Sequence, residues 1–329
     1  MEPLLKVENL VTCFGTKKGI VKAVDGVSFE IKAGKILGIV GESGCGKSVT
    51  SLSIMRLLPD QLGKITDGSI LFEGKDLRNL SEKEMVRIRG NKIAMIFQDP
   101  MTSLDPVMTI GRQLEETILA HEKVSRKEAE KKSLEMLKKV NIPMPEYRMK
   151  EYPHQLSGGM RQRIMIAMGL LCNPALLIAD EPTTALDVTI QAQILDLMKK
   201  LRDDFNTAII LITHDMGVVA DMADDILVMY AGRVMEQADA LALFENPCHP
   251  YTKALLKSIP RLDQEVEMLH SIKGTVPNPY DMPKGCKFCD RCECSMAKCL
   301  EKEPELFDVK GHKIRCWLFE KEAKGGARE

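Results

Sequence analysis

The segment GESGCGKS, residues 41–48, constrains the fold of this chain more than any other part of the sequence. It fits the pattern G-x-x-x-x-G-K-[S/T], in which the backbone N–H groups of a glycine-rich loop surround phosphate oxygens. The apolar run KILGIV precedes this phosphate loop, and residues 46–58 have the pattern of a helix. The amino terminus of that helix would add a partial positive charge, so the sequence predicts a nucleotide phosphate site within an α/β core.

The positions of the phosphate loop have separate expected roles. Lys47 should reach the β- and γ-phosphates of ATP, and the hydroxyl group of Ser48 should ligate Mg²⁺. The residues expected to line the phosphates are Gly41, Ser43, Gly44, Cys45, Gly46, Lys47, Ser48 and Val49.

A second apolar run, LLIADE at residues 176–181, ends in two carboxylates. Many strands end in an acidic residue, so this pair gains its meaning from the phosphate loop earlier in the chain. Asp180 is predicted to hold Mg²⁺ through water, and Glu181 is predicted to polarise the attacking water as general base.

Composition restricts the classes of partner. The chain has 329 residues, enough for about two domains, and a net charge of −1, which argues against a nucleic-acid partner. No apolar run approaches the roughly 18–20 residues of a membrane span, and the amino end lacks the pattern of a signal peptide. We therefore expect a cytosolic protein whose membrane role is peripheral, and its ten cysteines do not suggest a disulfide framework.

Three further motifs follow in a fixed order. Gln98 ends the apolar run KIAMIFQ, the segment LSGGM at residues 156–160 precedes a helical pattern, and His214 ends the apolar run AIILITH. Each is weak evidence alone. With the phosphate loop and the paired carboxylates, the set resembles the ATPase subunit of ABC transporters over Leu4 to Gln237.

The resemblance implies further site residues. Gln98 would sense Mg²⁺ and water, and His214 would contact the γ-phosphate of ATP. Residues 184–187, TALD, resemble the loop that crosses the dimer interface of the family. Phe14 resembles the aromatic residue that stacks on adenine, with a place in the core of a strand as the alternative.

The segment at residues 156–160, here called the signature segment, has an implied role across the dimer. Ser157, Gly158 and Gly159 would bind the γ-phosphate of ATP held by a partner subunit. Neither half of such a site suffices, so ATP would join two subunits and hydrolysis would release them.

The implied fold is a RecA-like P-loop ABC ATPase core with an antiparallel β subdomain and a helical subdomain. The core would comprise residues 1–98 and 157–238, and the helical subdomain residues 99–156. Residues 239–329, which contain many prolines, would form a C-terminal extension that includes the cysteine cluster.

A narrower resemblance comes from FQDPMTSLDPVMTIG, NPCHPYTKALLKSIP and TVPNPYDMPKGCKF, which are similar to segments of dipeptide and oligopeptide importers and their nickel-importing relatives. It implies an ATP-hydrolysing subunit at the cytoplasmic face of the membrane that energises import. The implied partners are two transmembrane permease subunits, a second ATPase subunit or a second copy of this chain with ATP, and, indirectly, an extracytoplasmic binding protein. The cargo stays open between dipeptides, oligopeptides and nickel.

Two other readings compete. ABC-type ATPases of translation or DNA repair usually carry two cassettes or a long coiled-coil insertion, which this chain lacks. An iron–sulfur module with an inactive ATPase is disfavoured because Lys47, Asp180, Glu181 and His214 are all present.

Six cysteines crowd the carboxyl end, five of them in GCKFCDRCECSMAKC at residues 285–299. Clustered thiols in a cytosolic protein usually bind a metal or an iron–sulfur cluster, and zinc also suits four thiolates. The run begins like a bacterial ferredoxin motif, but Met296 stands where a fourth cysteine would be due.

The importer resemblance implies a [4Fe–4S] cluster, with zinc as the alternative, on Cys286, Cys292, Cys299 and Cys316. Cys289 and Cys294 depart from the importer pattern, which leaves them as substitute ligands or spare thiols. We expect the metal group to stabilise a proline-rich segment whose own hydrophobic core is thin.

Overall fold

The computed structural model describes residues 2–59, 62–99, 103–184, 186–258 and 272–325. The chain forms two compact units. The first unit comprises Met1–Ile31, Ile36–Arg78 and Thr213–Glu329, and the second comprises Lys32–Lys35 and Asn79–Ile212. Both combine strands with helices, which confirms the predicted α/β class.

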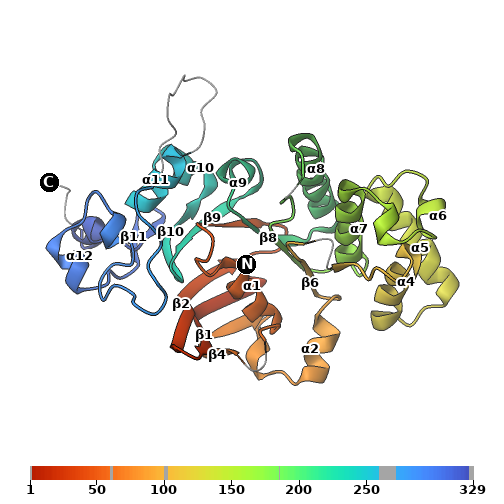
Figure 1. The fold of residues 1–329 in the computed structure, drawn as a ribbon, viewed down its shortest axis with the longest axis horizontal. Helices are drawn as coiled ribbons and strands as arrows, with labels where there is room; N and C mark the ends of the chain where they lie inside the picture. The colour runs from red at the N-terminus through yellow and green to blue at the C-terminus, as the bar shows by residue number, and fades with distance from the viewer. Residues whose placement is uncertain (1, 60–61, 100–102, 185, 259–271, 326–329) are drawn as a thin grey trace. The chain divides into compact units, whose positions relative to one another are not determined.

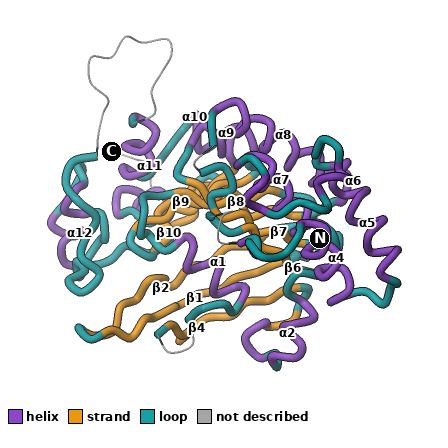
Figure 2. The backbone as a smooth tube through the Cα atoms, turned by 45° about the vertical axis from the view of Figure 1, so that its right-hand side comes forward, coloured by secondary structure: helices purple, strands orange, loops and turns teal. Residues whose placement is uncertain are grey.

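The first unit contains an antiparallel sheet near its amino end, with the order β2-β1-β4-β5. Figure 2 shows three of these strands side by side as long orange ribbons. The bounds are β1 (Leu5–Thr16), β2 (Gly19–Ile31), β4 (Gly63–Phe72) and β5 (Lys75–Asp76). The strands β1 and β2 are longer than the short apolar runs of the sequence. Their pairing continues across several bulges, where the register shifts.

A second set of strands in the first unit has the order β11-β12-β10-β9-β3. In β3 all five residues are buried, as expected for a continuous apolar run in a parallel strand. Strands β9 and β10 form an antiparallel hairpin that turns at residues 231–232. The bounds are β3 (Ile36–Val40), β9 (Asp225–Tyr230), β10 (Arg233–Asp239), β11 (Phe307–Val309) and β12 (His312–Ile314).

The helices of the first unit include α1, which follows the phosphate loop, and short helices of the carboxyl half (Figure 1). Their bounds are α1 (Lys47–Met55), α9 (Met216–Met222), α10 (Ala240–Glu245), α11 (Pro250–Lys257), α12 (Ala297–Glu301) and α13 (Glu320–Ala323). Short 3₁₀ turns are η3 (Cys289–Arg291) and η4 (Trp317–Phe319), and η1 (Leu77–Asn79) spans the boundary between the units.

The cysteine-containing segment, residues 285–316, is called here the thiol-rich tail. It joins the first unit through strand pairing, since β12 runs antiparallel to β10 with Glu236 opposite Ile314. It also shares a hydrophobic core with β9 and α11, in which Phe288 packs between Tyr230 and Tyr251. The thiol-rich tail thus packs into the hydrophobic core of the first unit and does not depend on its own apolar residues alone.

The second unit has the strand order β8-β7-β6, all parallel where paired. The residues of β7 and β8 are all buried, which matches the continuous apolar runs of the sequence. The strand bounds are β6 (Ile93–Ile96), β7 (Leu176–Asp180) and β8 (Ala208–Thr213).

Helices surround these strands and gather beyond them, where Figure 1 shows α4, α5, α6 and α7 together. A capping box formed by Ser125 and Glu128 stands at the start of α5. The bounds are α2 (Glu82–Ile88), α4 (Ile110–His121), α5 (Arg126–Lys139), α6 (Pro145–Arg148), η2 (Pro153–Gln155), α7 (Gly158–Leu170) and α8 (Val188–Phe205). No helix in the described ranges is long and apolar enough to cross a membrane.

Candidate functional site

The phosphate loop connects β3 to α1 and needs glycine at both of its ends. Gly41 has φ of 153° and Gly46 has φ of 101°. A Cβ atom would lie 2.1 Å from the carbonyl oxygen of Met229 at the first position, and 2.4 Å from that of Ala23 at the second. Because any side chain would collide with backbone there, the loop can keep this course only with glycine.

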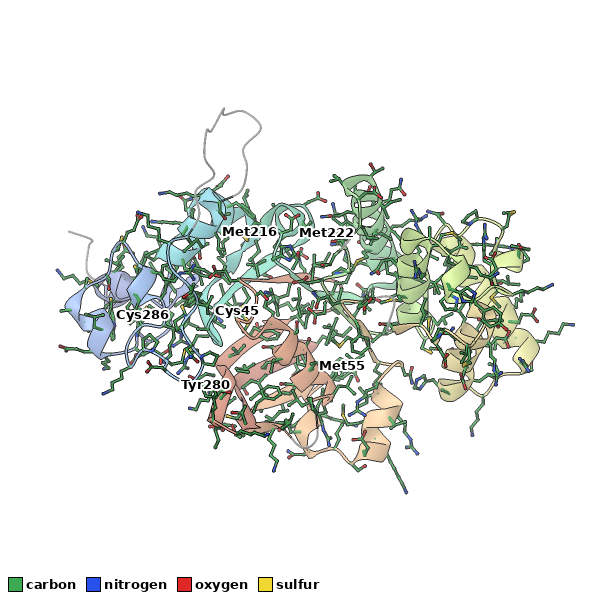
Figure 3. All side chains as sticks on the ribbon, in the orientation of Figure 1. Cys45, Met55, Met216, Met222, Tyr280 and Cys286 are labelled. Carbon is green, nitrogen blue, oxygen red and sulfur yellow. The ribbon has the colours of Figure 1, made fainter. Side chains whose placement is uncertain are left out.

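Lys47 is buried at the start of α1 and points its ammonium group back into the loop. Its Nζ atom donates to the carbonyl oxygens of Gly41 at 2.7 Å and of Glu42 at 3.1 Å, and lies 3.9 Å from Sγ of Cys45. Burial raises the pKa of the thiol of Cys45, a residue of the loop that is labelled in Figure 3. The positive charge is therefore held inside the loop, where phosphate oxygens would replace the carbonyls as its partners.

The first unit also contains two other predicted site residues, Phe14 and His214. Phe14 is half-buried in β1, and a Cβ atom on Gly63 of β4 would lie 2.9 Å from its ring. His214 is exposed after β8, immediately before α9, whose first turn is capped by the Asp215 carboxylate.

The acidic pair of the second unit ends β7. Asp180 is buried, with 5% of its surface exposed. Glu181 has φ of 48°, in the left-handed region, and its N–H donates to the carbonyl oxygen of Ile212 at 2.8 Å. Strained backbone of this kind costs of order 1–3 kcal/mol and persists where neighbouring contacts impose it, as at active sites.

The Glu181 carboxylate has two side-chain donors on one oxygen. Nε2 of Gln98 donates to its Oε2 at 3.0 Å, and Oγ1 of Thr184 donates to the same atom at 2.9 Å. The structure therefore brings together Glu181 and Gln98, which the sequence predicted to act in catalysis. Thr184 was expected only as part of a dimer-interface loop, and Ala185 of that loop lies outside the described residues.

The signature segment begins α7. Ser157 caps the helix, since its side-chain oxygen accepts from the N–H of Met160 at 3.3 Å. Both Ser157 and Gly158 are exposed, whereas a Cβ atom on Gly159 would lie 3.0 Å from Ile190 of α8. The helix thus offers its amino terminus to solvent, as the binding of a partner's nucleotide would require.

The thiol-rich tail folds back on itself between Cys286 and Cys299. The N–H of Cys286 donates to the carbonyl oxygen of Cys299 at 2.8 Å. A Cβ atom on Gly285 would lie 2.1 Å from the same oxygen, so glycine permits this close approach. Cys286, labelled in Figure 3, is buried together with Cys299 and Cys316.

Burial raises the pKa of three of the four predicted ligand thiols, and the charges of neighbouring thiols add to the effect. Burial is the first cause, and it raises the pKa of Cys286 to about 11 and that of Cys316 to about 12. Cys292 and Cys299 add to both effects through their charge, and burial with Cys299 also raises the pKa of Cys292. A positive metal centre would relieve this repulsion, because thiolate is the metal-binding form.

The two other thiols have different surroundings. Cys294 is exposed, and Sγ of Cys289 donates to Oδ1 of Asp290 at 3.4 Å. Within the described part of the chain, no three tail sulfurs lie within 4.8 Å of one another.

Three residues beside the phosphate loop were not predicted as site residues. The N–H of Glu42 donates to the hydroxyl oxygen of Tyr251 at 2.9 Å, and its carboxylate is bound by Arg291. Glu42 occupies a variable position of the loop pattern, Tyr251 belongs to a segment quoted for its resemblance to importers, and Arg291 lies in the cysteine-rich segment. The motifs that contain Tyr251 and Arg291 stood out in the sequence, but no local pattern predicted that either residue contacts Glu42.

Two family models match the chain. One, described as "ABC transporter", matches residues 24–184, and the other, described as "Oligopeptide/dipeptide transporter, C-terminal region", matches residues 235–299. Both parts of the resemblance drawn from the sequence motifs are therefore confirmed.

Curated relatives match over almost the whole chain. The oligopeptide transport ATP-binding protein AppD of Bacillus subtilis is 55% identical over 98% of both chains. The dipeptide transport ATP-binding protein DppD of the same organism is 54% identical over 98% of this chain and 97% of its own. The oligopeptide transport ATP-binding protein OppD of Escherichia coli is 52% identical over 92% and 89%.

Solved structures match over the ATPase part. The dimeric ATP-binding cassette MJ0796 bound to ADP and Pi has a TM-score of 0.65 and 30% identity, over 72% of this chain and 98% of that one. The protein cbiO1 from Clostridium perfringens, part of the ABC transporter complex cbiONQ, has a TM-score of 0.64 and 29% identity, over 75% and 92%. These matches confirm the predicted ABC ATPase fold.

Proposed function

Because the chain belongs to the ABC transporter ATPases, and among them to the ATP-binding subunits of oligopeptide and dipeptide transporters, we propose that it hydrolyses ATP to energise peptide import. The observation that carries the proposal is the match to both the ATPase part and the importer-specific carboxyl region. Relatives named as oligopeptide or dipeptide transport ATP-binding proteins share 51–55% identity with nearly the full chain.

In this proposal the phosphate loop holds ATP through its N–H groups and Lys47. Ser48 and Asp180 hold Mg²⁺, which supplies charge neutralisation for the phosphates when it is bound. Gln98 contributes to the same Mg²⁺ and water site. Phe14 stacks on the adenine ring.

Glu181 acts as general base on the attacking water. The two donors on its Oε2, from Gln98 and Thr184, fix the direction of the carboxylate and so aim its other oxygen. His214 contacts the γ-phosphate. Ser157, Gly158 and Gly159 bind the nucleotide of a second ATPase subunit, which agrees with the exposed start of α7.

The assembly we propose contains two permease subunits, a second ATPase subunit or a second copy of this chain, and an extracytoplasmic binding protein that supplies the peptide. The chain would then lie at the cytoplasmic face of the membrane as a peripheral subunit. The near-neutral charge of −1 suits attachment through protein contacts better than attachment to acidic lipid.

Glu181→Gln tests the catalytic part of this proposal in the reconstituted transporter. ATP binding should be retained, while kcat should fall by about 10²- to 10⁴-fold, because the base is lost and the phosphate contacts remain. Lys47→Ala is the companion variant and should lose nucleotide binding itself. Unchanged turnover in Glu181→Gln would remove Glu181 from the mechanism.

We further propose that the thiol-rich tail holds a [4Fe–4S] cluster on Cys286, Cys292, Cys299 and Cys316. Burial and the charges of neighbouring thiols raise the pKa of Cys286, Cys292 and Cys316, and a positive metal group would offset both effects. Zinc, which also suits four thiolates, is the alternative.

Anaerobic purification followed by iron, sulfide and zinc analysis distinguishes the two metals. Cys292→Ser should lower the iron content strongly, whereas Cys294→Ser, at an exposed thiol, should leave it unchanged. An iron-free preparation that is replete in zinc would refute the cluster.

A further inference from the structure

Arg291 links the thiol-rich tail to the phosphate loop. It stands immediately before Cys292, and only 4% of its side chain is exposed. Its Nη1 atom donates to Oε2 of Glu42 at 2.6 Å, and its Nη2 atom donates to Oε1 at 2.9 Å. This two-bond geometry is the strongest and most directional form of an arginine–carboxylate pair.

The rest of the guanidinium group is held by other parts of the first unit. Nη1 also donates to the hydroxyl of Tyr230 at 3.2 Å, and Nε donates to the carbonyl oxygen of Lys273 at 3.0 Å. The group lies 5.6 Å from the ring centroid of Tyr230 and 5.9 Å from that of Phe288. Arg291 therefore has a fixed position, and through its two hydrogen bonds it can also fix the position of the Glu42 carboxylate.

Glu42 lies between this arginine and the residue that binds phosphate. Its backbone oxygen accepts from Nζ of Lys47, and its N–H donates to the Tyr251 hydroxyl. A carboxylate within an anion-binding loop repels the phosphates of ATP, because like charges at short range disfavour binding. Pairing with Arg291 neutralises that carboxylate and fixes the backbone that carries it.

We propose that Arg291 is a positioning residue of the nucleotide site, which holds and neutralises Glu42 so that the affinity for ATP depends on the folded state of the thiol-rich tail. The proposal rests on the assignment of residues 41–48 as the phosphate site. Because coupling between two sites is reciprocal, bound ATP should in turn stabilise the tail.

A double-mutant cycle tests this on the full-length chain, purified anaerobically, with ATP affinity measured by equilibrium dialysis. Arg291→Ala should weaken ATP binding on the order of tenfold, because Glu42 is left charged and unheld. In the Glu42→Ala background the same change should have less than about a twofold effect, since the partner is already absent. Arg291→Lys should fall between, because it restores the charge without the two-bond geometry.

Arg315→Ala is the matched control. This arginine also lies in the tail and is half-buried, but its guanidinium donates to the carbonyl oxygens of Val234 at 2.9 Å and Pro304 at 3.1 Å. Its loss should lower the stability of the tail and leave ATP affinity in the folded fraction unchanged. Hydrogen exchange in residues 286–299 gives an independent readout: ATP should slow it in the natural chain and not in Glu42→Ala.

Two results would overturn the proposal: an unchanged affinity in Arg291→Ala, or an equal loss with and without the Glu42→Ala change. Should Arg291→Ala not fold, Arg291→Lys takes its place in the cycle. Lys47→Ala tests the assignment of residues 41–48 as the phosphate site independently of Arg291. Normal ATP binding in that variant would refute the assignment itself.

Discussion

Replacing Glu236 with glutamine should loosen the attachment of the thiol-rich tail to β10. The Glu236 side chain is fully buried, and three donors point at its two oxygens. The N–H of Cys248 lies 2.9 Å from Oε1 and Nδ1 of His312 lies 3.0 Å from it, while the N–H of His249 lies 2.9 Å from Oε2. One carboxylate thus joins β10, β12 and the segment that leads into α11.

The magnitude follows from the number of acceptors. Glutamine keeps the shape of Glu236 but offers one oxygen, so its amide group must face a backbone N–H on one side or the other. A buried donor without a partner costs about 1–3 kcal/mol, and the remaining bonds lose about 1 kcal/mol of charge assistance. We therefore expect the opening of the tail to become easier by about 2–4 kcal/mol.

Hydrogen exchange suits this prediction, because a chain with two units need not melt in a single step. Amides of β12 and of the thiol-rich tail should exchange about 30- to 1000-fold faster in Glu236→Gln, which is the same free energy expressed as a rate ratio. Glu301→Gln, at an exposed position of α12, is the control and should leave exchange unchanged. An acceleration below about threefold in Glu236→Gln would refute this account of the carboxylate.

Two further predictions concern the same region. Burial lowers the pKa of His249 to about 3, so below a pH of about 6.5 only the unfolded chain takes up the proton. The free energy of unfolding should therefore fall by about 1.4 kcal/mol for each pH unit below about 6.5. Urea unfolding at pH 7 and pH 5 measures this pH dependence of the unfolding free energy. The variant His249→Asn can keep the cap on α11 without titrating, so it should lose the pH dependence. An equal pH dependence in both proteins would contradict the prediction. Gly285→Ala should separate residue 286 from the carbonyl of Cys299 and reduce the iron content, whereas Gly15→Ala, where a Cβ meets nothing within 4 Å, should not; full iron content in Gly285→Ala would count against the close approach.

Much of the ATPase part could be predicted because its signals are local. A continuous apolar run marks a buried strand wherever it stands, and the residue at its end is placed by the strand itself, as with Glu181 and β7. The phosphate loop has a pattern tied to one backbone course, and the collisions at Gly41 and Gly46 show why. The capping box at Ser125 has the same character, since both partners lie within four residues.

The attachments of the tail could not be predicted because their partners lie far apart in the chain. Arg291 and Glu42 are separated by 249 positions, and no local sequence pattern around either residue predicts their ion pair. The pairing of β12 with β10 is similar, because a three-residue strand carries too short a pattern to be recognised. The division into residues 1–98 with 157–238, 99–156 and 239–329 stays a prediction, as do the metal ligands.

The separation of Glu42 from Arg291 also sets an order of events during synthesis. Ribosomes add about 5–20 residues per second, so the arginine emerges roughly 10–50 s after the glutamate it neutralises. Until then a nascent chain displays a phosphate loop with an uncompensated acidic group, which disfavours capture of ATP by an unfinished subunit. A chain cut short before Arg291 would remain in that condition permanently. If Arg291 holds Glu42 as proposed, the site reaches its full affinity for ATP only after translation has reached the tail.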